Sequence, residues 1–182
     1  MISIRTDSLC FAESQSQEFV LISRVHRFFQ GITLTVSSQL SEEKSVELVE
    51  FQRLKGLPDN SAVEALVKDL GVVYVTAITR DSCSGCIEQK PLFRELARKL
   101  TSDLAEKVHF SNVHVRYLDS DRAESWESKR MFRHAAYPTY LVHLRSRKGV
   151  LEVFRAVYPT MEELEKQTRE SLDLARYYQD EA

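Results

Sequence analysis

The pattern of hydrophobic and polar positions predicts strands that alternate with helices from residue 45 onwards. The continuous apolar run Val72–Ile78 is typical of a parallel strand that is covered on both faces. The sequence Thr160–Glu163 has the form of a capping box, which opens a last amphipathic helix. The predicted order from Val46 is β-α-β-α-β-α-β-β-α. That order indicates an α/β fold, a central mixed sheet flanked by helices on both faces.

The bounds of the elements follow from the same periodicities. The predicted strands are Val46–Leu54, Val72–Ile78, Val108–Leu118, Tyr140–Leu144 and Val150–Arg155, and the last two form an antiparallel hairpin. The predicted helices are Ala62–Leu70, Ile87–Leu104, Glu124–His134 and a closing one with Met161, Leu164, Leu172, Ala175 and Tyr178 on one face. In the third helix we expect Trp126 and Phe132 on the inner side.

Residues 1–44 are predicted to form an N-terminal extension to a domain over residues 45–182. Apolar positions within Ser14–Phe29 fit a helix that Gly31 ends, and the β-branched segment Ile32–Val36 fits a strand. A hairpin of Glu18–Ile22 with Ile32–Val36 is the alternative. A helix here would offer a Phe-rich face to its own sheet or to a second subunit, so a homodimer is an open expectation.

Composition narrows the class of protein. The chain has 182 residues, of which 29% are charged and 43% hydrophobic, as in an ordinary globular domain. A net charge of −2 gives no bulk electrostatic reason to bind nucleic acid or an anionic membrane. No apolar stretch approaches the ~20 residues that span a bilayer, and the start of the chain lacks the pattern of a secretory signal. We therefore expect a cytoplasmic protein with neither nucleic acid nor membrane as partner.

The cysteines supply the candidate chemistry. Three cysteines are too few for a disulfide scaffold, but Cys83-Ser84-Gly85-Cys86 lies between a strand and a helix. This spacing puts two sulfurs within bonding reach at a helix N-terminus, where free N–H groups stabilise a thiolate. Disulfide exchange is the favoured interpretation. The alternatives are two small buried residues, or a zinc site completed by Cys10, His109, His114 or His134, although none of these forms a second local pair.

Further motifs raise the specificity of this pattern. Pro91 follows Cys86 by five residues, and Tyr137-Pro138-Thr139 opens a strand ahead of the terminal hairpin and closing helix. With these elements the chain resembles the thioredoxin superfamily over roughly residues 46–178. The resemblance implies a thioredoxin-like fold and a protein-disulfide oxidoreductase activity. The two-unit archaeal disulfide oxidoreductases are another relative, but residues 1–44 are too short for a second unit.

The resemblance also implies roles for individual residues. Cys83 would be the nucleophile and Cys86 the resolving thiol. Pro138 would be the family's cis-proline, leaving the Tyr137 backbone free to pair with a substrate strand, although an ordinary trans Pro would also fit its position. Ser84 and Gly85 would contact substrate, and Pro91 would kink the helix as a structural residue. The partners would be protein thiols or disulfides and an unidentified reductant, with no organic cofactor and no metal.

Four positions near the motif qualify this picture. Ser82 stands where thioredoxins usually have Trp, and Ala77 aligns with their buried acid, so deprotonation of Cys86 would depend on water or on a group such as Glu88. Arg80 and Asp81 either tune the thiol or are solvated loop charges. The rival function is a non-catalytic thioredoxin-fold adaptor or redox sensor that holds a protein partner at the Pro138 edge.

Overall fold

A computed structural model describes residues 45–58 and 61–180 of the chain. The elements are β1 (Glu47–Glu50), α2 (Ser61–Leu66), β2 (Val73–Arg80), α3 (Ser84–Leu104), β3 (Val108–Val115), α4 (Ala123–Met131), β4 (Thr139–Ser146), β5 (Gly149–Val157) and α5 (Met161–Asp180). Their order is the predicted one. The elements expected within residues 14–36, and the homodimer surface with them, lie outside the described residues, so the domain boundary near residue 45 stays a prediction.

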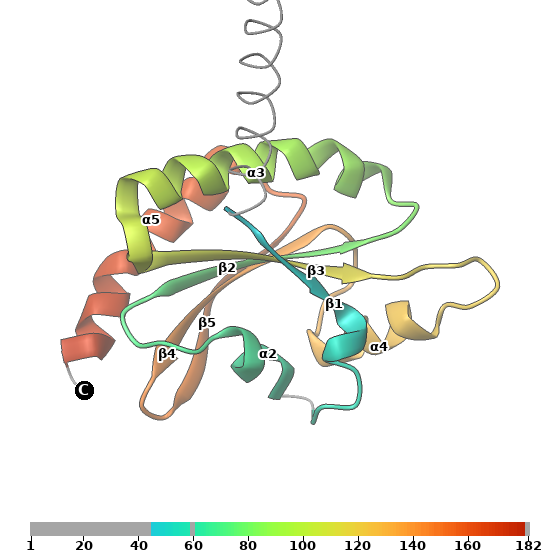
Figure 1. Ribbon diagram of the computed structural model, residues 1–182, viewed down its shortest axis with the longest axis horizontal. Coiled ribbons are helices and arrows are strands. Elements are labelled where there is room, and N and C mark those ends of the chain that lie inside the picture. The colour runs from blue at the N-terminus through green and yellow to red at the C-terminus, as the bar shows by residue number, and fades with distance from the viewer. Residues whose placement is uncertain (1–44, 59–60, 181–182) are drawn as a thin grey trace, which may run out of the picture. The chain divides into compact units, whose positions relative to one another are not determined.

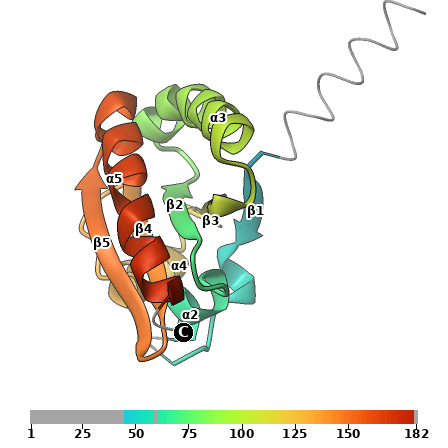
Figure 2. The same ribbon diagram turned by 90° about the vertical axis from the view of Figure 1, so that its left-hand side faces the viewer.

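The strands form one mixed sheet in the order β1-β3-β2-β4-β5 (Figure 1). Strands β1, β3 and β2 are parallel, whereas β4 runs antiparallel to β2, and β5 is antiparallel to β4. Helices α3 and α5 cover one face of the sheet, and α2 and α4 lie on the other (Figure 2). The predicted fold is confirmed: this is a thioredoxin-like α/β fold.

Strand β2 lies at the centre of the sheet and is buried over almost its whole length, as its apolar sequence predicts. On the side of α3 and α5, Phe93 packs edge-on against Phe110 and Tyr140, at centroid distances of 5.6 and 5.2 Å. The core on the opposite side is a second apolar cluster that includes Phe51 and Phe132. Strand β2 is thus covered on both faces and paired with β3 and β4. This packing fixes the position of its end, from which the cysteine motif follows.

Several predicted bounds were wrong, among them the end of the helix expected over Glu124–His134, which stops at Met131. The first strand ends at Glu50 rather than Leu54, because Phe51 turns into the core, where its ring lies 6.4 Å from that of Phe132. The first described helix ends at Leu66 rather than Leu70. Beyond it, Arg145 donates to the carbonyl of Val67, so the chain runs along β4 instead of continuing as helix. The third strand of the predicted set ends at Val115, three residues early.

The prediction for helix α4 was half right. Phe132, just past its end, is buried as expected, but Trp126 is 69% exposed and does not belong to the core. The helix buries Ser125, Ser128 and Met131 instead. Helix α5 packs its predicted apolar face against the core, with Leu164 and Ala175 buried, and α3 continues through Pro91. None of the described helices is long and apolar enough to cross a membrane.

Candidate functional site

The two motif cysteines lie where the chain leaves β2 and enters α3. Cys83 is the N-cap of the helix, with an extended backbone, and Cys86 lies one turn further on. Their Cα atoms are 5.2 Å apart and their sulfurs are joined in a disulfide. Both side chains are nearly buried, with exposures of 8% and 5%. The site therefore holds its two sulfurs in bonding contact close to the protein surface.

The sulfur of Cys83 takes the place that a hydroxyl or carboxylate oxygen occupies in an ordinary helix cap. The backbone N–H of Cys86 donates to it over 3.1 Å. Helix α3 is 21 residues long, so its N-terminal partial positive charge is fully developed at this point. An N–H donor and a helix dipole both favour negative charge on sulfur, so the position suits a thiolate.

Pro138 lies beside the dipeptide that separates the cysteines. The Tyr137–Pro138 peptide bond is cis. A methyl group built on Gly85 would lie only 3.3 Å from Cδ of Pro138. The fold thus brings together Gly85 and Pro138, which are over fifty residues apart in the sequence. Ser84 and Pro91 are both exposed, on the first and second turns of α3.

Helix α4 contacts the side chain of Tyr137 through hydrogen bonds. Its hydroxyl oxygen lies 2.6 Å from that of Ser128, and the Ser128 hydroxyl lies 3.1 Å from Nε2 of His134. The rings of His134 and Tyr137 also meet edge-on at 4.7 Å between centroids. These contacts fix the side chain of Tyr137 and leave its backbone at the start of β4.

His134 is neutral in this network. Burial lowers its pKa to about 4, despite an opposing hydrogen bond to the Ala136 carbonyl, and the positive charges of Lys129 and Arg155 lower it further. Because a carbonyl can only accept, Nδ1–H donates to Ala136 over 2.9 Å. Nε2 therefore accepts the Ser128 proton, and the Tyr137 hydroxyl donates to Ser128 and, over a longer distance of 3.2 Å, to the Ser125 carbonyl.

The two charged residues before the motif contact β3 and the loop that follows it. The guanidinium of Arg80, at the end of β2, lies 4.0 Å from the centre of the Tyr117 ring and 5.4 Å from that of Tyr137. Asp81 contacts Nε2 of His114 at 3.0 Å and accepts the backbone N–H of Tyr117. Both side chains therefore order the loop after β3 next to the motif. Ala77 lies in the core, so no acid occupies that position beneath the helix.

Sequence reasoning missed one residue at this site. Tyr158 lies between β5 and α5, just ahead of the capping box that opens the closing helix. Its backbone N–H donates to the carbonyl of Pro138 over 3.1 Å, and its φ of 51° lies in the left-handed region. A methyl group on Gly85 would lie 2.8 Å from Cε2 of its ring. The only available signal was Gly85 itself, since glycine between the cysteines leaves room for a neighbouring group.

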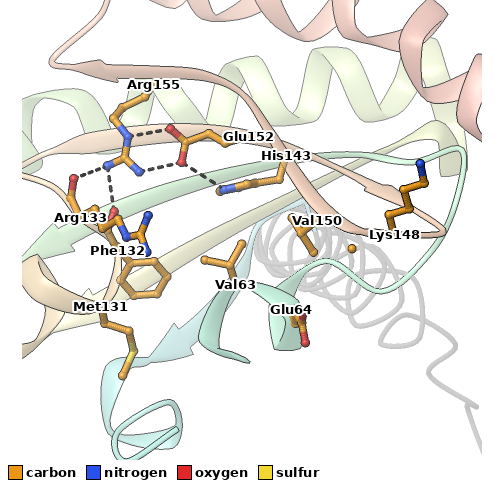
Figure 3. A pocket seen from close by; sticks show the side chains of 11 residues that line it. Val63, Glu64, Met131, Phe132, Arg133, His143, Lys148, Val150, Glu152 and Arg155 are labelled. Carbon is orange, nitrogen blue, oxygen red and sulfur yellow. Dashed lines mark hydrogen bonds and ion pairs between the residues drawn. The ribbon is translucent and has the colours of Figure 1, made fainter. Parts of the chain in front are cut away.

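A separate pocket of about 360 Å³ opens between α2, the end of α4 and the β4–β5 hairpin (Figure 3). Arg155 pairs with Glu152 there and donates to the carbonyls of Phe132 and Arg133, while His143 faces Glu152 at 3.5 Å. None of the predicted site residues lines it. The disulfide chemistry therefore belongs to the edge beside Pro138 and not to this pocket.

The described residues contain no group of three or more metal-binding side chains placed to share an ion. The histidines considered as ligands are engaged elsewhere: His109 contacts Glu47, His114 contacts Asp81, and His134 is in the Ser128 network. Cys10 lies outside the described residues.

Of the comparisons with known proteins, only the one with solved structures finds similar chains. No family model matches the chain, and no curated protein matches it. Three similar solved structures are thioredoxins, from Malassezia sympodialis (16% identity, TM-score 0.47), Trichomonas vaginalis (10%, 0.48) and Nicotiana alata (20%, 0.46). They cover 70%, 68% and 69% of this chain, and 90%, 96% and 92% of their own. Neither a function nor a residue of the site is assigned from this likeness.

Proposed function

We propose that this protein is a thiol–disulfide oxidoreductase that exchanges disulfides with protein substrates through Cys83 and Cys86. The observation that supports the proposal is the bonded cysteine pair at the N-terminus of α3, beside Pro138. A thiolate is the reactive form of cysteine, and this position favours it. A redox-inert pair of buried residues would need neither the helix terminus nor the neighbouring strand edge.

The exchange has two balanced steps. The Cys83 thiolate attacks one sulfur of a substrate disulfide, which forms a mixed disulfide and expels the other substrate sulfur as a thiolate. The Cys86 thiolate then attacks Sγ of Cys83 and releases the second substrate thiolate. Two electrons pass to the substrate, and the protein is left with the Cys83–Cys86 disulfide. An external dithiol must reduce that disulfide before the next cycle.

Substrate would bind along the edge next to the sulfurs. An extended segment can pair with the Tyr137 backbone, as peptides do when they add a strand to an exposed edge. Ser84 and Gly85 would lie under the substrate between the two cysteines. Pro91 would act only through the shape of α3. No organic cofactor or metal enters this chemistry, and a reducing compartment such as the cytoplasm would keep the dithiol ready.

Insulin reduction with dithiothreitol tests the proposal. Wild-type protein should accelerate precipitation of the insulin B chain, and Cys83→Ser should abolish the acceleration. Cys86→Ser is the matched control, because it keeps the nucleophile but should accumulate the mixed disulfide, which mass spectrometry detects. Equal rates for wild type and Cys83→Ser would contradict an enzymatic role. Retained binding of a protein partner by the double Cys→Ser variant would then favour the adaptor.

A further inference from the structure

The ring of Tyr158 lies against the dipeptide between the two cysteines. A methyl group on Gly85 would be 2.8 Å from Cε2 and 3.0 Å from Cδ2 of this ring, distances that leave no room for a side chain. The same methyl group would be 3.3 Å from Cδ of Pro138. The ring therefore closes the space next to both Gly85 and Pro138, where the substrate would bind.

Three hydrogen bonds hold the Tyr158 loop in this place. The Tyr158 N–H donates to the carbonyl of Pro138, and the buried side chain of Gln89 donates from Nε2 to the carbonyl of Pro159 over 2.8 Å. Just beyond them, Thr160 accepts the N–H of Glu163 and so fixes the start of α5. The loop is thus fastened to β4, α3 and α5 at once.

The phenol is also tied to the motif helix. Glu88, two residues after Cys86, raises the pKa of the Tyr158 phenol by hydrogen bonding to it. The side chain is nevertheless 44% exposed, so burial does not hold it in position. The left-handed backbone at φ 51° is unusual for a bulky residue and directs the ring towards Gly85. The position of the Tyr158 ring therefore depends on surface contacts, which can form and break.

We propose that Tyr158 is a specificity-determining residue of this site, whose ring screens the cysteine pair against bulky folded disulfides and admits small or extended ones. The proposal rests on the exchange function of Cys83 and Cys86. A segment that contacts both the Pro138 edge and Cys83 has to pass along the ring. A thin extended chain can do so, whereas the surface around a disulfide of a folded protein collides with it.

Alkylation of Cys83 tests the screen without requiring turnover. In a Cys10→Ser, Cys86→Ser background, the rate of reaction is measured with N-ethylmaleimide and with the same maleimide coupled to a small folded protein. Tyr158→Gly should raise the rate with the bulky reagent by about tenfold, a typical size for sterically set discrimination. The rate with N-ethylmaleimide should change by less than about twofold. Tyr158→Phe, which keeps the ring, should stay close to the unsubstituted background.

Two further variants distinguish steric screening by the Tyr158 ring from a general loss of rigidity in the fold. Ala105→Gly relieves a left-handed backbone of similar φ, 50°, at the far end of α3, and should change neither rate. Tyr158→Asn removes the ring but keeps a side chain that accepts left-handed geometry, and serves if the glycine variant unfolds. Equal acceleration with both reagents, or no change with the bulky one, would overturn the screen. Failure of the insulin assay would instead count against the exchange function.

Discussion

The hydroxyl oxygens of Ser128 and Tyr137 lie 2.6 Å apart, so helix α4 is tied directly to the residue that precedes Pro138. Ser128 is fully buried and also donates to His134. One side chain therefore satisfies two polar neighbours that have little access to water. This explains why the inner face of a short helix is polar.

Ser128→Ala should destabilise the protein by about 1–3 kcal/mol, because the loss leaves Nε2 of His134 and the Tyr137 hydroxyl without their shared partner. Urea unfolding followed by circular dichroism measures the change. Ser102→Ala, at an exposed position of α3, is the control and should be neutral within about 0.5 kcal/mol. If Ser128→Ala were as stable as Ser102→Ala, the hydrogen-bond network would contribute nothing to stability.

The neutral His134 makes stability depend on pH. Its folded-state pKa is about 4 against an unfolded value of 6.5, so protons bind preferentially to the unfolded chain between these values. The stability associated with this group is therefore complete above about pH 6.5 and decreases as the pH falls towards 4, by at most about 3 kcal/mol. Denaturant midpoints measured across that range should show the slope.

Substitution of His134 shows whether this residue causes the pH dependence of stability. His134→Gln should flatten the profile between pH 6.5 and 4, whereas His109→Gln, at a partly exposed position on β3, should retain the slope. A wild-type profile that is already flat over this range would show that His134 is not held neutral by burial.

Arg155 fastens β5 to the turn after α4. Nη1 donates to the carbonyls of Phe132 and Arg133, each at 2.8 Å, and Nε donates to Glu152 at 2.7 Å. Burial alone would raise the pKa of Glu152, but hydrogen bonds from His143 and Arg155 outweigh it and hold that pKa at about 2. A single guanidinium thus serves three acceptors around the pocket of Figure 3.

Arg155→Lys should therefore cost about 1–2 kcal/mol, because an ammonium cannot reproduce the planar fork. The pKa of Glu152 should rise towards its ordinary 4.5, which an NMR titration of its side chain measures. The stability supplied by this carboxylate, present above pH 4.5 and lost as the pH falls to 2, should shrink accordingly. Arg176→Lys, on the exposed face of α5, is the control, and an unmoved Glu152 pKa would contradict the assigned cause.

Strong periodicity predicted the fold correctly, because each long apolar repeat packs into a cluster of buried side chains on one or both faces of the sheet. The buried run in β2 and the apolar face of α5 are the clearest examples. The prediction that Trp126 is buried was wrong because α4 has only nine residues and buries two serines instead. These serines form hydrogen bonds with the Tyr137 hydroxyl. A pattern of hydrophobic positions contains no record of such bonds.

The candidate site likewise contains residues that the sequence predicts and one that it does not. Cys83 and Cys86 are the first and last residues of a four-residue motif, so their proximity follows from sequence alone. Tyr158 reaches them only because the β4–β5 hairpin returns the chain beside Pro138 and a left-handed residue turns the ring inward. That placement depends on tertiary structure and on a backbone conformation for which tyrosine has no preference.

Gly85 and Tyr158 should be energetically coupled. In wild type, Gly85→Ala places a methyl group 2.8 Å from the Tyr158 ring, and such overpacking typically costs about 1–3 kcal/mol. In a Tyr158→Gly background the nearest remaining neighbour is Pro138 at 3.3 Å, which needs only a small shift. There the higher helix propensity of alanine, worth up to about 1 kcal/mol, should make the substitution neutral or stabilising.

A double-mutant cycle of unfolding free energies measures this coupling, which should exceed about 1 kcal/mol. The sign of the Gly85→Ala effect is the decisive result, since it should change from destabilising to neutral or favourable once the ring is absent. Additive effects would mean that the ring moves away at no cost, and such a ring could not screen the cysteines. Strong coupling would show that the position of Tyr158 over the motif is a property of the folded state in solution.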